Sequence, residues 1–246
     1  MKFRSMLITV SMGLTPFVHA AEDKKHWDYR GVHGPAAWAD IEPGFSGCKL
    51  GREQSPIDIR GATKAALPAL EMAYQNSAAE VVNNGHTVQV NLADAGALTL
   101  DGVPYKLVQF HFHTPSEERV KGRNYAMVAH LVHKSAEGKL AVVAVLLKQG
   151  RANATLAPVF ADLPAVEGAK RALADTFNAA GLLPEQRGYY RFVGSLTTPP
   201  CSEGVRWQVL KQPVEVSKAQ LTAFRKLYRM NARPVQPLNG RVVEEG

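Results

Sequence analysis

The chain has 246 residues, 46% of them hydrophobic and 21% charged, and a formal net charge of +7. This length and apolar content suit one large domain with a substantial core. The basic residues are scattered rather than clustered, and no internal repeat or Gly/Ser-rich linker divides the chain, so neither a nucleic-acid-binding protein nor a repeat protein is favoured.

The first twenty residues have the pattern of a secretory signal. A basic start is followed by an apolar run from Met6 to Val18 and by small residues up to Ala20. A membrane anchor needs about 20 apolar residues, whereas this run is shorter and is interrupted by Gly13 and Pro16. We therefore expect a signal peptide at residues 1–20 and a single domain at residues 21–246. The mature protein is expected to be periplasmic or secreted, without a membrane span.

Cys48 and Cys201 are the only cysteines. In an exported protein, a lone pair of cysteines is expected to form one disulfide. Two reduced, buried thiols are the alternative.

Short segments of alternating polarity, separated by turn residues such as Asn84-Gly85 and Asp101-Gly102, predict mainly strands. The predicted strand segments are Ala79 to Leu92, Leu98 to Leu100, Tyr105 to Phe112, Ala126 to His133 and Leu140 to Leu147. The last is apolar throughout, as expected for a strand buried on both faces.

Helical patterning is confined to the segments Thr155 to Phe160, Val166 to Ala174, and Ser217 to Tyr228, where Ser217 is the expected N-cap. The predicted fold class is therefore mainly β (α+β), with a large, mostly antiparallel sheet and short peripheral helices.

A histidine pair on one predicted strand suggests a metal site. His111 and His113 are two residues apart, so they share a face with Gln109, and their Cα atoms are roughly 6.6 Å apart. His130 on the next predicted strand is a candidate third ligand. Three protein ligands with an open fourth position are typical of catalytic zinc. Spacing alone also allows His133 or His86 as the third ligand, or histidines with no metal at all.

Seven motifs in the same order along the chain resemble α-class carbonic anhydrases of the exported bacterial type. They are His26-Trp27-Asp28-Tyr29 with Gly34-Pro35-Ala36-Ala37-Trp38, Gln54-Ser55-Pro56-Ile57-Asp58-Ile59, Asn83-Asn84-Gly85-His86, Phe110-His111-Phe112-His113-Thr114-Pro115-Ser116-Glu117, Ala129-His130-Leu131-Val132-His133, Ser195-Leu196-Thr197-Thr198-Pro199-Pro200-Cys201 and Asn231-Ala232-Arg233-Pro234.

The resemblance implies a single domain around a twisted ten-stranded sheet and a zinc-dependent lyase that interconverts carbon dioxide and bicarbonate. It assigns Zn²⁺ to His111, His113 and His130, leaves His133 outside the site, and matches Cys48 and Cys201 to a disulfide. It also implies inhibition by sulfonamides and small anions.

The resemblance further assigns the catalytic roles. Thr197 would accept a hydrogen bond from a zinc-bound hydroxide and donate one to an ionised Glu117, and His86 would be the proton shuttle. Tyr29 and Asn84 would order the intervening water, and Gln109 would support a ligand. The remaining matches form the substrate pocket: Val132, Val142, Leu196, Thr198 and Trp207.

One part of the pattern departs from the family. The residue two before the third histidine is usually Glu and accepts a hydrogen bond from it, but here it is Val128. The residue after the family's Ser-Glu is usually His, but here it is Glu118. We expect the carboxylate to have moved, so that Glu118 reaches His130; a solvated Glu118 is the alternative.

Two other functions compete with an enzyme. One is a non-catalytic carbonic-anhydrase-like binding module, but such relatives usually lose a zinc histidine and this chain keeps all three. The other is an exported zinc-buffering protein, which would be expected to have a more histidine-rich segment.

Overall fold

The computed structural model describes residues 26–246. The predicted signal peptide at residues 1–20 lies outside the described residues. Within them, none of the helices combines the length and the apolar character needed to cross a bilayer.

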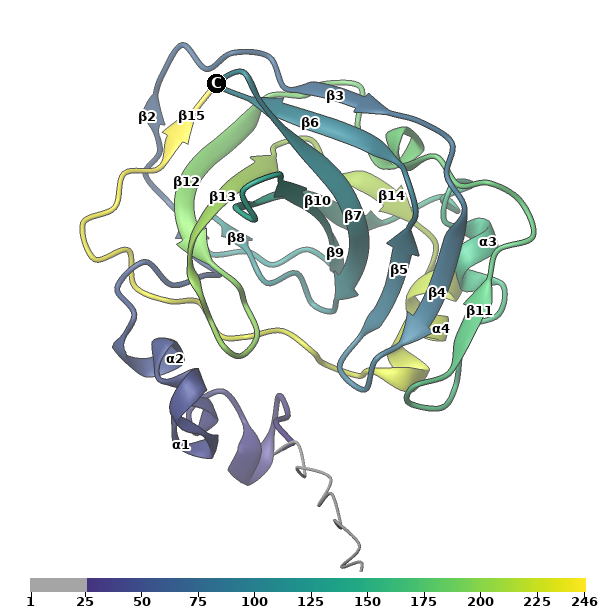
Figure 1. Ribbon diagram of the computed structural model, residues 1–246, viewed down its shortest axis with the longest axis horizontal. Coiled ribbons are helices and arrows are strands. Elements are labelled where there is room, and N and C mark those ends of the chain that lie inside the picture. The colour runs from purple at the N-terminus through teal and green to yellow at the C-terminus, as the bar shows by residue number, and fades with distance from the viewer. Residues whose placement is uncertain (1–25) are drawn as a thin grey trace, which may run out of the picture.

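A large twisted sheet forms the body of the molecule, with β7, β9 and β10 near its middle (Figure 1). Ten of its strands follow one another in the order β11-β4-β5-β7-β9-β10-β13-β12-β15-β2, while β3, β6 and β14 pair beside this path. The strands are β2 Thr63–Lys64, β3 Glu71–Tyr74, β4 Ala79–Asn83, β5 Val88–Leu92, β6 Gly96–Leu100, β7 Val103–His113, β9 Met127–Ser135, β10 Leu140–Gln149, β11 Lys170–Ala172, β12 Tyr189–Ser195, β13 Glu203–Leu210, β14 Val214–Val216 and β15 Glu244–Glu245. A separate two-stranded sheet joins β1 Asp58–Ile59 to β8 Arg119–Val120.

The predicted mainly β fold is confirmed, and the sheet is mixed. Most neighbours are antiparallel, but β10 runs parallel to β13 and β14, and β15 runs parallel to β2. The expected ten strands match the longest path. The full sheet has thirteen, because three short strands extend it at its sides.

The two faces of the central strands bury different side chains. On β7, Phe110 and Phe112 enter the larger hydrophobic core, whereas His111 and His113 lie on the opposite face. On β9, Val128 and Val132 belong to a second apolar cluster. This alternation agrees with the period of two expected for a strand and places the histidine face next to the second cluster.

The helices are short and lie at the periphery (Figure 1). They are α1 Trp38–Ile41, α2 Gly47–Leu50, α3 Ala157–Phe160 and α4 Lys218–Leu227, with 3₁₀ turns at Gly31–His33, Pro43–Phe45 and Ala179–Leu182. The expected N-cap of the last helix is confirmed: Ser217 and Gln220 form a capping box.

The helix predicted over Val166 to Ala174 is wrong. Gly168 adopts a φ of +78°, which ends any helical path, and Lys170–Ala172 instead pair with β4 as the edge strand β11. The helix predicted from Thr155 is shorter than expected and begins at Ala157.

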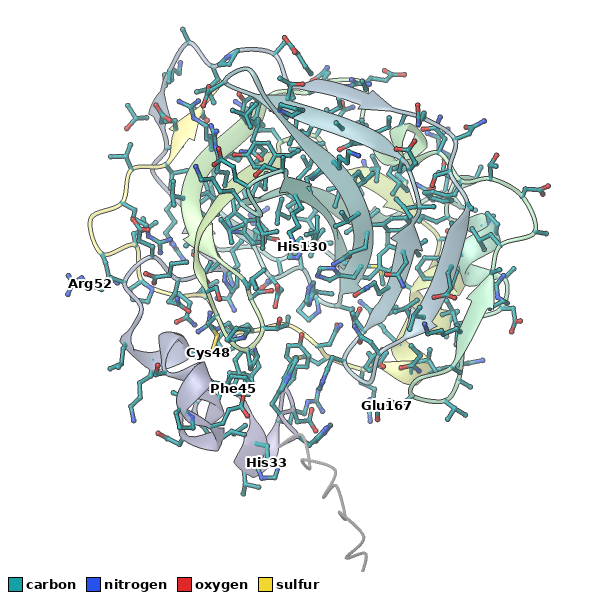
Figure 2. The ribbon with its side chains drawn as sticks, viewed as in Figure 1. His33, Phe45, Cys48, Arg52, His130 and Glu167 are labelled. Carbon is teal, nitrogen blue, oxygen red and sulfur yellow. A yellow bond between two sulfur atoms is a disulfide. The ribbon has the colours of Figure 1, made fainter. Side chains whose placement is uncertain are left out.

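Cys48 and Cys201 form a disulfide, as predicted. It joins α2 to the loop that precedes β13, and Figure 2 shows Cys48 at this helix, below His130 in the view.

Candidate metal centre and active site

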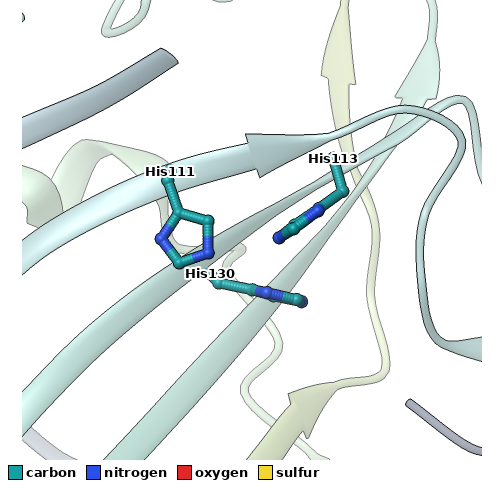
Figure 3. Close-up of side chains that lie close together, drawn as sticks. All are labelled: His111, His113 and His130. Carbon is teal, nitrogen blue, oxygen red and sulfur yellow. The ribbon is translucent and has the colours of Figure 1, made fainter. Parts of the chain in front are cut away.

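Three imidazoles converge on the face of the sheet opposite Phe110 and Phe112 (Figure 3). His111 on β7 lies directly opposite His130 on β9, and His113 ends β7 two residues later. One nitrogen from each ring lies within 4.8 Å of the other two. This is the only group of three potential ligands found in residues 26–246.

Each imidazole has an oxygen acceptor for its other nitrogen. The Nδ1 of His111 is 2.9 Å from the Gln109 side-chain oxygen, and the Nδ1 of His113 is 2.7 Å from the Asn231 carbonyl oxygen. For His130 the nitrogen is Nε2, which lies 3.0 and 3.1 Å from the two oxygens of Glu118.

These acceptors fix the tautomer of each ring. Carbonyl and carboxylate oxygens accept hydrogen bonds, so the nitrogen that faces them carries the proton. The lone pairs are then left on Nε2 of His111, Nε2 of His113 and Nδ1 of His130, the atoms that can bind a metal.

The residues fit a zinc ion. The Nε2 atom of His113 is buried without a hydrogen-bond partner, a costly arrangement unless another group binds the atom. Three neutral imidazoles with outer acceptors are a typical catalytic zinc donor set.

Burial favours the neutral form of His111 and His113, whereas His130 lies beside carboxylates. Burial, together with the neighbouring His130, lowers the pKa of His111 to about 3, and the pKa of His113 falls well below its usual value for the same reasons. Burial also lowers the pKa of His130, but the adjacent Glu118 and Glu117 together more than offset this, and the pKa is raised overall.

Glu117 borders the cluster from the segment after β7. Its carboxylate is fully buried, with Oε2 3.5 Å from Nε2 of His113, and Oε1 accepts the main-chain N–H of Arg233 at 2.8 Å. Burial raises the pKa of Glu117 to about 8, against the opposing effects of His130, the Arg233 N–H and the Thr197 hydroxyl. A cation bound by the histidines would favour the ionised form.

Thr197 lies in the loop between β12 and β13 and is 5% exposed. Its hydroxyl is close enough to Glu117 to lower the pKa of that carboxyl group. The structure thus brings together Glu117 and Thr197, which are eighty residues apart in sequence.

An apolar wall adjoins His130. Val142 lies directly opposite Val132 on one side and Trp207 on the other, so that β9, β10 and β13 each contribute one side chain. Leu196 packs against the same cluster. The Trp207 ring meets the His130 ring edge-on at 4.9 Å, and half-buried Thr198 follows Thr197 in its loop.

His86 lies on a hydrogen-bonded turn between β4 and β5. The Asn84 side-chain oxygen accepts the main-chain N–H groups of His86 and Thr87, and the Asn231 amide donates to the His86 carbonyl. The half-buried His86 ring stacks on Trp27 with a centroid distance of 3.6 Å, and burial lowers its pKa.

The two residues expected to order water differ in their surroundings. Asn84 is exposed, and its oxygen is already bonded to the backbone of the turn. Tyr29 is buried, with its ring 6.5 Å from that of His113.

Three residues near the site had no role predicted from the sequence. Asn231 accepts from His113, Arg233 contacts Glu117, and Trp27 stacks on His86. All three lie within motifs that carry the family resemblance. Two of them act through main-chain atoms, which a side-chain pattern does not reveal.

The chain is similar to known carbonic anhydrases in both sequence and structure. The sequence profile of eukaryotic-type carbonic anhydrase matches residues 33–246. A carbonic anhydrase of Pectobacterium carotovorum is 43% identical over 92% of this chain and 93% of its own, and one of Neisseria gonorrhoeae is 44% identical over 95% and 94%. The α-carbonic anhydrase of Thermovibrio ammonificans, solved with sulfanilamide, has a TM-score of 0.88 and 48% identity over 89% of this chain and 99% of its own.

Proposed function

The chain belongs to the eukaryotic-type, or α, carbonic anhydrase family, and on this premise we propose that it catalyses the zinc-dependent, reversible hydration of carbon dioxide to bicarbonate and a proton. The convergence of His111, His113 and His130 is the observation that carries the proposal. These three residues would hold the ion.

Bound zinc would supply a Lewis acid that lowers the pKa of a coordinated water to about 7, a value for which carbonic anhydrase is itself the standard example. Three neutral ligands leave the charge of the ion undiminished. The outer acceptors Gln109, Asn231 and Glu118 support this role, because they hold each ring with a lone pair directed inward.

Thr197 and Glu117 would orient the nucleophile. A threonine hydroxyl has one proton, and donating it to an ionised Glu117 leaves only acceptor lone pairs facing the reaction site. Groups that carry a hydrogen are therefore favoured there. The burial of both side chains supports this assignment.

The apolar wall of Val132, Val142, Leu196 and Trp207 would hold carbon dioxide, with Thr198 on its polar side. The substrate is small and uncharged, so it gains from contact with hydrocarbon. Bicarbonate is an anion, and such a wall stabilises it poorly, so that product release is favoured.

His86 would transfer the proton to solvent, with Tyr29 and Asn84 ordering the water between. Histidine is the side chain whose ordinary pKa lies nearest neutrality. Its half-buried position at a chain turn, with polar groups around it, supports this assignment.

Glu118 would fix the His130 ring in place of the glutamate that relatives carry at the position of Val128. Support comes from the contact between its carboxylate and Nε2 of His130, both fully buried.

Two further proposals concern partners and location. A carbonic anhydrase of Chlamydomonas reinhardtii was solved with acetazolamide and that of T. ammonificans with sulfanilamide, and we expect sulfonamides and small anions to inhibit this chain too. We also propose that residues 1–20 direct export, so that residues 21–246 act as one domain in the periplasm or outside the cell.

Stopped-flow measurement of carbon dioxide hydration by metal-quantified protein tests the function. We expect hydration that disappears on chelation and returns with one equivalent of zinc. Full zinc occupancy without hydration would instead favour a non-catalytic binding module.

A further inference from the structure

Glu117 and Thr197 must be aligned with each other, yet they lie on segments that are far apart in sequence and have no strand pairing between them. Glu117 lies between β7 and β8, and Thr197 lies between β12 and β13. Within residues 26–246, the main-chain N–H that donates to the Glu117 carboxylate is that of Arg233, from the irregular segment after α4.

The Arg233 side chain is 3% exposed and binds a second part of the chain. Its guanidinium donates to the side-chain oxygen of Gln54 at 2.9 Å, to the carbonyl oxygen of Ser55 at 2.7 Å and to that of Cys48 at 3.0 Å. It also lies over the ring of Trp38 at 5.6 Å. Burying a cation is costly unless hydrogen bonds compensate, so these contacts define one conformation.

Gln54 and Ser55 in turn hold both ends of the loop that carries Thr197. Ser55 exchanges two hydrogen bonds with Ser195, its N–H donating to Oγ at 2.9 Å and its own Oγ accepting the Ser195 N–H at 3.1 Å. The Gln54 amide donates to the carbonyl oxygen of Cys201 at 3.0 Å.

We propose that Arg233 is a positioning residue that aligns Glu117 with Thr197: its main chain fixes the carboxylate, and its guanidinium fixes the Gln54-Ser55 segment that clamps the Thr197 loop. This proposal rests on the proposed function of the site. Because the two catalytic side chains share one buried anchor, loosening the guanidinium shifts one relative to the other.

Arg241 provides a matched control. Its guanidinium also binds this region, donating to the main-chain oxygens of Gln54 at 2.7 Å and Val193 at 3.0 Å. It has no contact with Glu117 or with the Thr197 loop among its hydrogen bonds. Arg241 is only partly buried, and Arg241→Lys thus reports the general cost of losing a guanidinium fork near Gln54.

The test compares Arg233→Lys with Arg241→Lys. Lysine keeps the charge but replaces the planar fork with a single ammonium group. For Arg233→Lys we expect full zinc content and a fall in kcat/KM for hydration between about 10- and 100-fold, since misplacing reacting groups by about 1 Å can cost about 100-fold. We also expect a loss of sulfonamide affinity relative to thiocyanate. Arg241→Lys should leave both quantities close to wild type.

The inhibitor ratio separates positioning from general damage. A sulfonamide nitrogen carries a hydrogen for Thr197 to accept, whereas thiocyanate carries none, so misalignment of Thr197 and Glu117 weakens the sulfonamide selectively, and Arg241→Lys controls for other changes in the pocket. An unchanged ratio in zinc-loaded Arg233→Lys would overturn the inference.

A second variant covers the case in which Arg233→Lys fails to fold. Ser55→Ala removes the Oγ that accepts the Ser195 N–H but leaves Arg233 in place, and it should shift the inhibitor ratio in the same direction. A wild-type ratio in folded Ser55→Ala would overturn the relay through Ser55. If zinc-loaded wild type itself lacked hydration activity, the proposed function would fail instead, whatever the variants do.

Discussion

Replacing Glu118 is expected to weaken zinc retention. In Glu118→Ala, the buried Nε2–H of His130 loses both carboxylate oxygens, at 3.0 and 3.1 Å. Nothing else in the described hydrogen bonds of residues 26–246 accepts from this nitrogen. The His130 ring then loses the hydrogen bonds that set its orientation, and its basicity falls.

The magnitude follows from the usual cost of removing the acceptor behind a metal-bound histidine. That cost is about 10- to 100-fold in metal affinity, which corresponds to about 1.4–2.7 kcal/mol. The higher end applies here, because Glu118 and His130 are both buried and water cannot easily replace the carboxylate.

Chelator competition at equilibrium measures the zinc dissociation constant, and the rate of zinc loss to excess chelator measures retention. Glu118→Gln serves as the matched variant, since it keeps an oxygen acceptor without the charge and should fall between wild type and Glu118→Ala. Wild-type zinc affinity in Glu118→Ala would refute the reasoning and leave Glu118 as a buried structural carboxylate.

Three further predictions concern other parts of the molecule. His86→Ala should slow hydration in weak buffer and recover with added imidazole; an unchanged rate in weak buffer would remove His86 from proton transfer. Burial lowers the pKa of His133 to about 4, so below about pH 6.5 this side chain is protonated in the unfolded chain but still neutral in the folded chain. The free energy of unfolding should therefore fall by about 3 kcal/mol as the pH is lowered from 6.5 to 4. Urea unfolding of His133→Gln should lose this part of the pH dependence, and an identical slope would contradict it. Reducing the Cys48–Cys201 bridge, which spans 153 positions, should lower the free energy of unfolding by at most about 5 kcal/mol. Denaturant titration with and without reductant measures this, and equal midpoints would show that the bridge adds no stability.

Local sequence patterns predict the strand faces that build the metal site. Alternation along β7 predicts that His111 and His113 share one face and that Phe110 and Phe112 share the other. The structure agrees, because both phenylalanines lie in the larger core and both histidines lie in the cluster of potential ligands. The pairing between strands cannot be predicted from such local patterns. That His111 faces His130 depends on the register of β7 against β9, which is fixed by contacts between segments and not by the spacing within either.

The strands β12 and β13 were not predicted, although one of them supplies Trp207. On β13, Val205, Trp207 and Val209 alternate with polar residues, so the period of two is present, but over a short stretch. On β12, Gly194 has no side chain, and Arg191 shares a face with exposed Val193. Neither strand has a long apolar run like that of β10, so the local signal is weak and the pairing with neighbouring strands defines both.

The roles of Asn231 and Arg233 could not be predicted from the sequence for another reason. Asn231 binds His113 through its carbonyl oxygen, and Arg233 binds Glu117 through its N–H. Every residue type offers these main-chain groups, so only the path of the chain decides which of them reach the site.

The two consecutive carboxylates after β7 show how a short irregular segment can serve two purposes. Glu117 and Glu118 lie outside any strand, so their side chains are free of the strict alternation of a sheet and both can face the histidines. Glu117 reaches Nε2 of His113 and the Arg233 N–H, while Glu118 reaches Nε2 of His130. Val128, by contrast, lies in the same apolar cluster as Val132 and Val142. Because Glu118 raises the pKa of Glu117, removing it should favour the ionised Glu117. Activity per bound zinc should therefore fall far less in Glu118→Ala than zinc affinity does, which separates metal retention from catalysis.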